Sequence, residues 1–417
     1  MKKGVKLTLI ICTAGILVIA GIVAIIFGVK QSSLRKYEST RVTVGFYEVS
    51  QAQQESFTNI IEEISSNASF DVEFYKIEKD QDFEQQINDK KINLILAPAG
   101  YAVEKAVDVA SESAQIEPAV TGGMFSSMRQ LAVTKDNKLK AVPLIFDNLE
   151  IDIELSAFNM SGLESIATWD DLEKFAQLQK SEMYPVSFAG AEPVFLLDLL
   201  GAMGEALEGY DAYLKAAEIL KAAVEEKNAD GEFDAAAVAN KIFIDPDAPI
   251  PYSLYYLKQF IKKGYVTPAA RELINTDINS YIQQRVTRCF FTTLSVHRTF
   301  DTKAVSRFST IYVPSKTNAG QRHFTATATF AVPVNSNKNT GVVIEGLLSE
   351  QNQAKLSQST GLAPVLANCR TPDKEADDAR YWVAATNTPV AGLGHEAQLT
   401  DSELVQLANA INALLFY

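Results

Sequence analysis

The sequence is poor in the residues that most often build catalytic and metal sites. Its 417 residues include three cysteines, three histidines and two tryptophans. The histidines, His297, His323 and His395, are widely separated and lack the spacing of zinc ligands. Neither a GxSxG nor an HExxH motif occurs, and no His, Cys and Asp stand at the spacing of a known catalytic motif. We therefore expect no metal, no cofactor and no enzyme activity.

The chain also lacks the basic surface that nucleic-acid binding requires. It has 51 acidic and 38 basic side chains, for a formal net charge of −13. A protein that neutralises phosphates needs clustered Lys and Arg. Nucleic acid is therefore excluded as a partner.

The one long apolar run lies at the N-terminus, over residues 7–29. Twenty-three helical residues span roughly 34 Å, enough to cross the hydrocarbon core of a membrane. We expect an uncleaved transmembrane anchor followed by a linker over 30–40, with a cleaved signal peptide as the alternative. A lipid anchor on Cys12 is disfavoured because apolar residues continue for seventeen positions after it. Whether Cys289 and Cys369 pair is left open, because sequence does not show proximity.

The segment after the linker alternates strand and helix patterns. We expect strands over 41–49, 70–77 and 92–97, the last a continuous apolar run of the kind found in a buried parallel strand. Helix spacing over 51–65 and 80–89 separates them. This β-α-β-α-β order predicts an open α/β sheet.

Further elements follow without internal repeats. We expect strands over 140–146, 151–155, 289–293, 309–313 and 325–332, and helices over 168–178, 194–230, 252–263, 341–353 and 402–415. Thr168 is the expected N-cap of its helix, and carboxylates follow it in the first turn.

Several segments match one family in order. They are KAVPLIFDN (140–148), SGLESIATWDDLEKFAQ (161–177), DINSYIQQRVTRCFFTT (277–293) and the stretch from TATATFAVPVNSN to STGLAPV (325–365). Together with the opening strands they resemble the bacterial extracellular solute-binding proteins that serve ABC importers, a group that includes maltose- and other sugar-binding proteins. The match covers most of residues 41–370. Each motif is weak alone, and their shared order carries the resemblance.

The resemblance implies a two-lobed, periplasmic-binding-protein-like (type II) α/β fold with a hinge. Lobe one would hold 41–145 plus 287–332, and lobe two 146–286 plus 333–417. The implied role is capture of a small polar solute by a monomer and its delivery to ABC permease subunits. The soluble part would then lie on the extracytoplasmic side of the cytoplasmic membrane, held by its N-terminal helix.

In such a fold the ligand binds beyond the carboxyl ends of the strands, which nominates binding residues. They are Tyr47, Glu48, Tyr101, Asp147, Phe188, Glu192, Phe291 and Thr292. Four of them also have a structural alternative: Tyr47 as a cap of the sheet edge, Asp147 as a turn residue, Glu192 as a helix cap, and Phe291 as core.

The sequence departs from the family where a sugar would be recognised. The family often has a tryptophan just after the strand that ends near Thr293, and here Thr292-Thr293-Leu294-Ser295 contains none. Carbohydrate is therefore one solute class among several. The alternative function is a sensory or scaffold module that keeps the fold without transport.

Overall fold

The computed structural model describes residues 41–180, 184–311, 313–316, 326–386 and 389–417. The expected anchor (7–29) and linker (30–40) lie outside these residues, as does His323. Within the described part of the chain, no helix is both long and apolar enough to cross a membrane.

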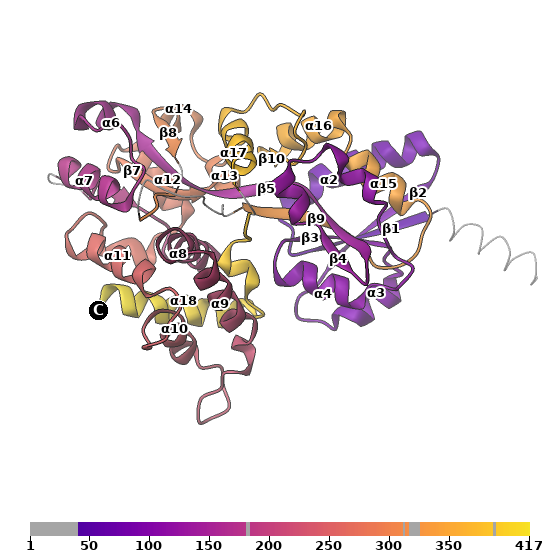
Figure 1. Cartoon of the computed structure of the whole chain (residues 1–417), viewed down its shortest axis with the longest axis horizontal. Coiled ribbons are helices and arrows are strands. Elements are labelled where there is room, and N and C mark those ends of the chain that lie inside the picture. Colours follow the sequence, from indigo (N-terminus) through magenta and orange to yellow (C-terminus); the bar gives the residue numbers. More distant parts are fainter. Residues whose placement is uncertain (1–40, 181–183, 312, 317–325, 387–388) are drawn as a thin grey trace, which may run out of the picture.

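Two groups of elements lie side by side, joined by one long strand (Figure 1). We call the group that contains the first strands lobe one. Its elements are β1 (Arg41–Tyr47), α2 (Gln51–Ala68), β2 (Asp71–Ile77), α3 (Phe83–Lys90), β3 (Leu94–Pro98), α4 (Tyr101–Val109), η1 (Pro118–Gly123), α5 (Ser126–Gln130), β4 (Val133–Lys135), β9 (Ala326–Pro333), α15 (Thr340–Leu347), α16 (Glu350–Thr360), β10 (Ala363–Pro364) and α17 (Lys374–Ala384).

Lobe two is mainly helical. Its elements are α6 (Leu155–Ser161), α7 (Trp169–Gln179), β6 (Val186–Ser187), α8 (Pro193–Glu208), α9 (Tyr210–Lys221), η2 (Ala223–Glu225), α10 (Ala235–Phe243), α11 (Pro251–Lys262), η3 (Pro268–Glu272), α12 (Asn275–Gln283), β7 (Cys289–Thr293), α13 (Leu294–His297), α14 (Thr302–Val305), β8 (Phe308–Ile311), η4 (Leu393–Glu396) and α18 (Asp401–Phe416).

Strand β5 (Lys138–Glu154) joins the lobes. The sheet runs β2-β1-β3-β9-β5-β7-β6, and β4, β8 and β10 also pair with β5. The first half of β5 pairs with β9 in lobe one, and its second half pairs antiparallel with β7 in lobe two. Strands β1, β2 and β3 are parallel, so their carboxyl ends and the helices that follow lie at one edge.

Local sequence explains several boundaries. Helix α7 begins with a capping box in which Thr168 and Asp171 each bond the other's backbone N–H. Trp169 is buried beneath that turn and stacks on Phe291, with ring centroids 6.3 Å apart. All five residues of β3 are buried, which explains its continuous apolar run.

Each lobe has its own hydrophobic core, and these cores correct the expected lobe boundaries. Within residues 334–383, every side chain that belongs to a hydrophobic core belongs to the core of lobe one, because α15 and α16 pack on α2. The packing is close: a Cβ at Gly346 would lie 2.7 Å from Ile64. Conversely, Cys289–Phe291 and Phe308 belong to the core of lobe two, because β7 and β8 pair with the second half of β5.

Of the three expected places where the chain changes lobes, one agrees with the cores and two differ. The first crossing, expected near Phe146, lies in β5 between Phe146 and Leu149, which belong to different cores. The other two were expected near Val286 and Pro333. Instead, Phe308 still belongs to the lobe-two core and Ala328 to that of lobe one, and Val383 belongs to the lobe-one core and Val390 to that of lobe two.

Four expected elements also differ in extent. The strands expected over 140–146 and 151–155 form the single strand β5. The helix expected over 194–230 breaks at Gly209, whose φ is +98°, and the one expected over 341–353 breaks between α15 and α16. Cys289 and Cys369 are free thiols in different lobes.

Candidate functional site

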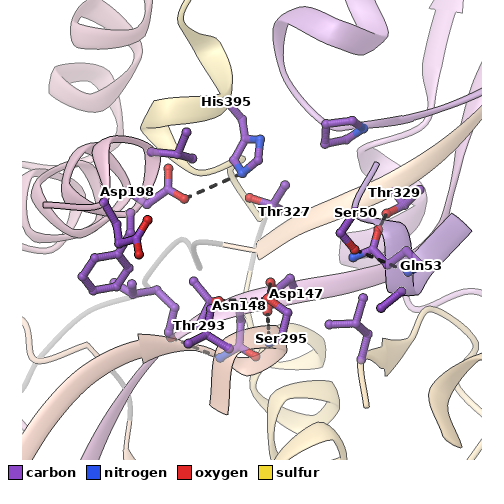
Figure 2. Close-up of a pocket in the computed structure, with 18 of the residues that line it drawn as sticks. Ser50, Gln53, Asp147, Asn148, Asp198, Thr293, Ser295, Thr327, Thr329 and His395 are labelled. Carbon is purple, nitrogen blue, oxygen red and sulfur yellow. Dashed lines mark hydrogen bonds and ion pairs between the residues drawn. The ribbon is translucent and has the colours of Figure 1, made fainter. Parts of the chain in front are cut away.

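A cavity of about 510 Å³ lies between the lobes (Figure 2). Its walls come from the carboxyl-end edge of the lobe-one sheet, from the crossing in β5, and from α8, α13 and η4. The described residues that line it are Glu48, Ser50, Ala52, Gln53, Pro98, Asp147, Asn148, Leu149, Glu192, Pro193, Val194, Phe195, Asp198, Asn275, Thr293, Ser295, Val296, Thr299, Thr327, Thr329, Thr360, Leu362 and His395.

The crossing of β5 supplies the floor. Asp147 Oδ1 accepts hydrogen bonds from the backbone N–H groups of Asn148 (2.9 Å) and Ser295 (3.0 Å), and Asp147 Oδ2 accepts one from the Ser295 hydroxyl. Burial raises the pKa of Asp147, and these hydrogen bonds oppose the shift. Asn148 is 2% exposed; its amide nitrogen donates to Leu149 O, while its Oδ1 has no hydrogen-bond partner.

Asp198 and His395 face each other across the lobe-two wall (Figure 2). Asp198 Oδ1 accepts a hydrogen bond from Gly394 N (2.8 Å), and its Oδ2 lies 3.7 Å from His395 Nε2. Burial, and to a smaller extent the charges of Asp147 and Glu396, raise the pKa of Asp198 to about 8, while the hydrogen bond from Gly394 opposes the shift. Burial also lowers the pKa of His395 to about 4. The pKa of each group is shifted in the direction that favours its uncharged form. Desolvation therefore outweighs the attraction between the two groups, and both are uncharged at neutral pH.

Lobe one supplies acceptors and hydroxyls. Glu48 follows β1 with φ +55°, in the left-handed region, and its carboxylate lies 3.7 Å from Lys79 Nζ. Gln53, in the first turn of α2, accepts a hydrogen bond from the Thr329 hydroxyl of β9 (3.2 Å). One wall of the cavity is thus built from three separate segments of lobe one, which contain Glu48, Gln53 and Thr329.

Of the eight binding residues expected from sequence, Glu48, Asp147 and Glu192 line this cavity. The other five do not. Phe188, Phe291 and Thr292 are at most 2% exposed and belong to the interior of lobe two. Thr292 precedes the cavity residue Thr293, and successive residues of a strand point to opposite sides.

Tyr47 and Tyr101 lie beside the cavity but do not line it. Tyr47 is buried, and Lys105 Nζ donates to its hydroxyl at 3.3 Å and lies over the Tyr101 ring. Burial, then the charge of Glu48, raises the pKa of Tyr47. The backbone of His395 packs so closely on Gly100 that a Cβ there would collide with its carbonyl oxygen. Segment η4 therefore covers the N-terminus of α4, where Tyr101 was expected to meet a ligand.

Asp198, Ser295 and His395 line the cavity but were not predicted from the sequence. Asp198 had a detectable signal, because it is the only charged residue in the apolar run Val194–Met203. His395 had none, since it lies in a stretch to which the resemblance does not extend.

Beyond the cavity, a row of buried carboxyl groups follows β5 into lobe two. Glu150, Asp152 and Glu154 are at most 3% exposed. Glu150 Oε2 shares a 2.8 Å hydrogen bond with His297 Nδ1, the Thr310 hydroxyl donates to Asp152 at 2.9 Å, and Arg288 pairs with Glu154. We call these three residues the β5 acid row.

Within the described ranges, Glu150, Asp152 and His297 form the one group whose side-chain atoms could coordinate a metal ion, with ligand atoms all within 4.8 Å. Burial raises the pKa of Glu150 well above its usual range and that of Asp152 to about 7. The group lines no part of the cavity, and Glu150 Oε1 and Asp152 Oδ2 have no hydrogen-bond partner among the described residues.

The cavity is equipped to hold a polar molecule by hydrogen bonds from both sides. Two α/β lobes that meet on a crossing strand, with a cavity at the carboxyl ends of the strands, define the two-lobed fold of bacterial solute-binding proteins. No family model matches the sequence, and no curated protein matches it either.

Solved structures match across most of the chain. One is the bacterial solute receptor AcbH, described with an exclusive preference for β-D-galactopyranose. Its TM-score is 0.66 at 13% identity, over 89% of this chain and 96% of that one. A chitin oligosaccharide binding protein matches with a TM-score of 0.60 at 12% identity, over 90% and 100%. The extracellular solute-binding protein of Staphylococcus aureus in complex with maltose matches with a TM-score of 0.59 at 11% identity, over 90% and 95%.

Proposed function

We propose that this chain is a non-catalytic solute-binding protein that captures a small polar solute between its lobes and delivers it to an ABC-type permease on the extracytoplasmic side of the membrane. The observation that carries the proposal is the cavity itself, whose walls come from both lobes and from the strand that joins them. A ligand that contacts both walls binds best when they are close together, and so favours a closed arrangement. That change of shape is what a permease can recognise.

The relatives of known structure support the class of function. Their names refer to galactopyranose, chitin oligosaccharide and maltose, so a solute of saccharide size is in keeping with the fold. The cavity volume lies within the range of small-molecule sites.

Binding is tested by thermal unfolding of the full chain with a panel of sugars, polyols, amino acids, amines and small anions. A true ligand at 100 times its Kd stabilises the fold by about 2.7 kcal/mol. Thr293→Trp, which fills the cavity, should abolish the shift. Tyr101→Ala, outside the lining, should keep it. A panel without any shift, or a shift that survives Thr293→Trp, would contradict the proposed site.

Transport needs a second experiment. Uptake of the identified solute should fall when the gene for this chain is deleted and return with the wild-type gene but not with Thr293→Trp. Unchanged uptake despite specific binding would favour a sensory or scaffold role.

A further inference from the structure

The polar groups that line the cavity are unbalanced in favour of hydrogen-bond acceptors. Four of the lining residues are carboxyl groups: Glu48, Asp147, Glu192 and Asp198. None of the described lining residues is a lysine, arginine or tryptophan, the side chains that only donate. Serine and threonine can do either, so they do not restore the balance.

One lining acceptor is buried without a partner. Asn148 Oδ1 has no hydrogen-bond partner, although the residue is 2% exposed and its amide nitrogen is already engaged with Leu149 O. A buried acceptor without a donor is costly, so the missing donor is expected from the molecule that fills the cavity.

Three of the four carboxyl groups have no lysine or arginine partner among the described residues. Lys79 lies 3.7 Å from Glu48 and also pairs with Asp401. Among the described residues, no lysine or arginine pairs with Asp147, Glu192 or Asp198. Asp198 has only His395 opposite it, with Asp147, Glu396 and Tyr213 as further titratable neighbours.

We propose that the cavity selects a solute with an ammonium group, which donates to Asn148 Oδ1 and is neutralised by Asp147, Glu192 and Asp198. An ammonium group has three donors and one positive charge, and the lining offers the matching acceptors and negative charges. The ligand class is therefore an amine, such as a polyamine or an amino sugar. A carboxylate or phosphate would meet like charge. This inference rests on the proposed function, because it names the solute class of the same site.

The lining has few aromatic side chains on which the face of a neutral sugar could stack. Phe195 is its one aromatic residue among those described, and it is 7% exposed. Stacking on such a face therefore contributes less here than charge and hydrogen bonding.

Binding of a cation in the cavity should be accompanied by release of a proton from Asp198. Asp198 is protonated in the empty cavity at neutral pH, because burial raises its pKa to about 8. A bound ammonium favours the carboxylate, so Asp198 loses its proton to solvent on binding and affinity rises as pH increases toward 8.

Matched probes test the inference by isothermal titration calorimetry on the full chain. Putrescine, spermidine and glucosamine carry ammonium groups, glucose and N-acetylglucosamine are neutral, and glucuronate is an anion. We expect glucosamine to bind at least tenfold more tightly than glucose, about 1.4 kcal/mol, and glucuronate not to bind. Repeating the titration at pH 7 in two buffers of different ionisation enthalpy should reveal proton release.

Charge-neutral variants locate the effect. Asp198→Asn should abolish proton release, and Glu192→Gln should reduce the preference for glucosamine. Asp211→Asn and Glu218→Gln, which make the same changes at exposed positions of α9, should leave both unchanged.

The outcomes separate the two proposals. Equal binding of glucose and glucosamine, without proton release, would overturn the ammonium inference and leave solute binding intact. Absence of binding by every probe and by the broad solute panel would overturn both.

Discussion

The carboxyl groups of the cavity and those of the β5 acid row differ in what surrounds them. In the acid row, Glu150 shares a hydrogen bond with His297, and Thr310 donates to Asp152. In the cavity, Asp198 has a backbone N–H and a histidine 3.7 Å away. The acid row is enclosed in lobe two, where Glu150 Oε1 and Asp152 Oδ2 have no hydrogen-bond partner within the described part of the chain, whereas Asp147, Glu192 and Asp198 line the cavity. Access to the cavity, rather than burial alone, therefore distinguishes the two sets of carboxyl groups.

The largest expected effect comes from removing a partner of the acid row. His297→Ala should lower the free energy of unfolding by about 3 kcal/mol, because it removes a buried ring from the core and leaves Glu150 without its hydrogen-bond partner. Urea denaturation followed by circular dichroism measures the loss. His395→Ala in the cavity should cost less than about 1 kcal/mol, since His395 makes no hydrogen bond with Asp198. Equal losses of unfolding free energy for His297→Ala and His395→Ala would contradict the proposed difference between the acid row and the cavity.

The next effect is the pH dependence caused by Asp198. Its pKa is about 8 in the folded protein, against 3.8 as the reference for an unfolded chain. The folded state therefore holds an extra proton between these values, and stability falls as pH rises through this window. Asp198→Asn should reduce that fall by about 1.4 kcal/mol per pH unit between pH 5 and pH 7. Unfolding free energies of both proteins at several pH values check this, and parallel profiles would contradict the raised pKa.

The smallest effect concerns single hydroxyl groups. Thr310→Val should cost about 1 kcal/mol, because Asp152 loses its buried donor. Thr293→Val, at the cavity wall, should cost below about 0.5 kcal/mol, since water can replace a hydroxyl there. Chemical denaturation of the two variants side by side would show the order, and a larger loss for Thr293→Val would reverse the comparison.

The strand and helix pattern of residues 41–97 was predictable because local periodicity decides it. The apolar run of β3 and the capping box at Thr168 are encoded within a few residues. Lobe membership was not predictable in this way. Whether β7 pairs in lobe two, or α15 packs on α2, depends on contacts between residues far apart in the chain.

The site could be predicted only in part. Asp147 and Glu192 follow from the rule that ligands bind beyond strand ends. Thr292 was one residue from the wall, because a shift of one position in a strand reverses the side chain. Tyr101 failed for a different reason: η4, from a stretch with no recognisable pattern, covers the end of α4.

Gly100 has a consequence for motion between the lobes. The carbonyl of His395 rests on its Cα, while the rest of η4 packs on α8 of lobe two. Lys221 of α9 reaches Glu104 of α4 across the same boundary. The missing side chain at position 100 thus sets how closely the two halves can approach. A single added methyl group there would collide with the His395 carbonyl and act as a wedge that holds the two lobes further apart.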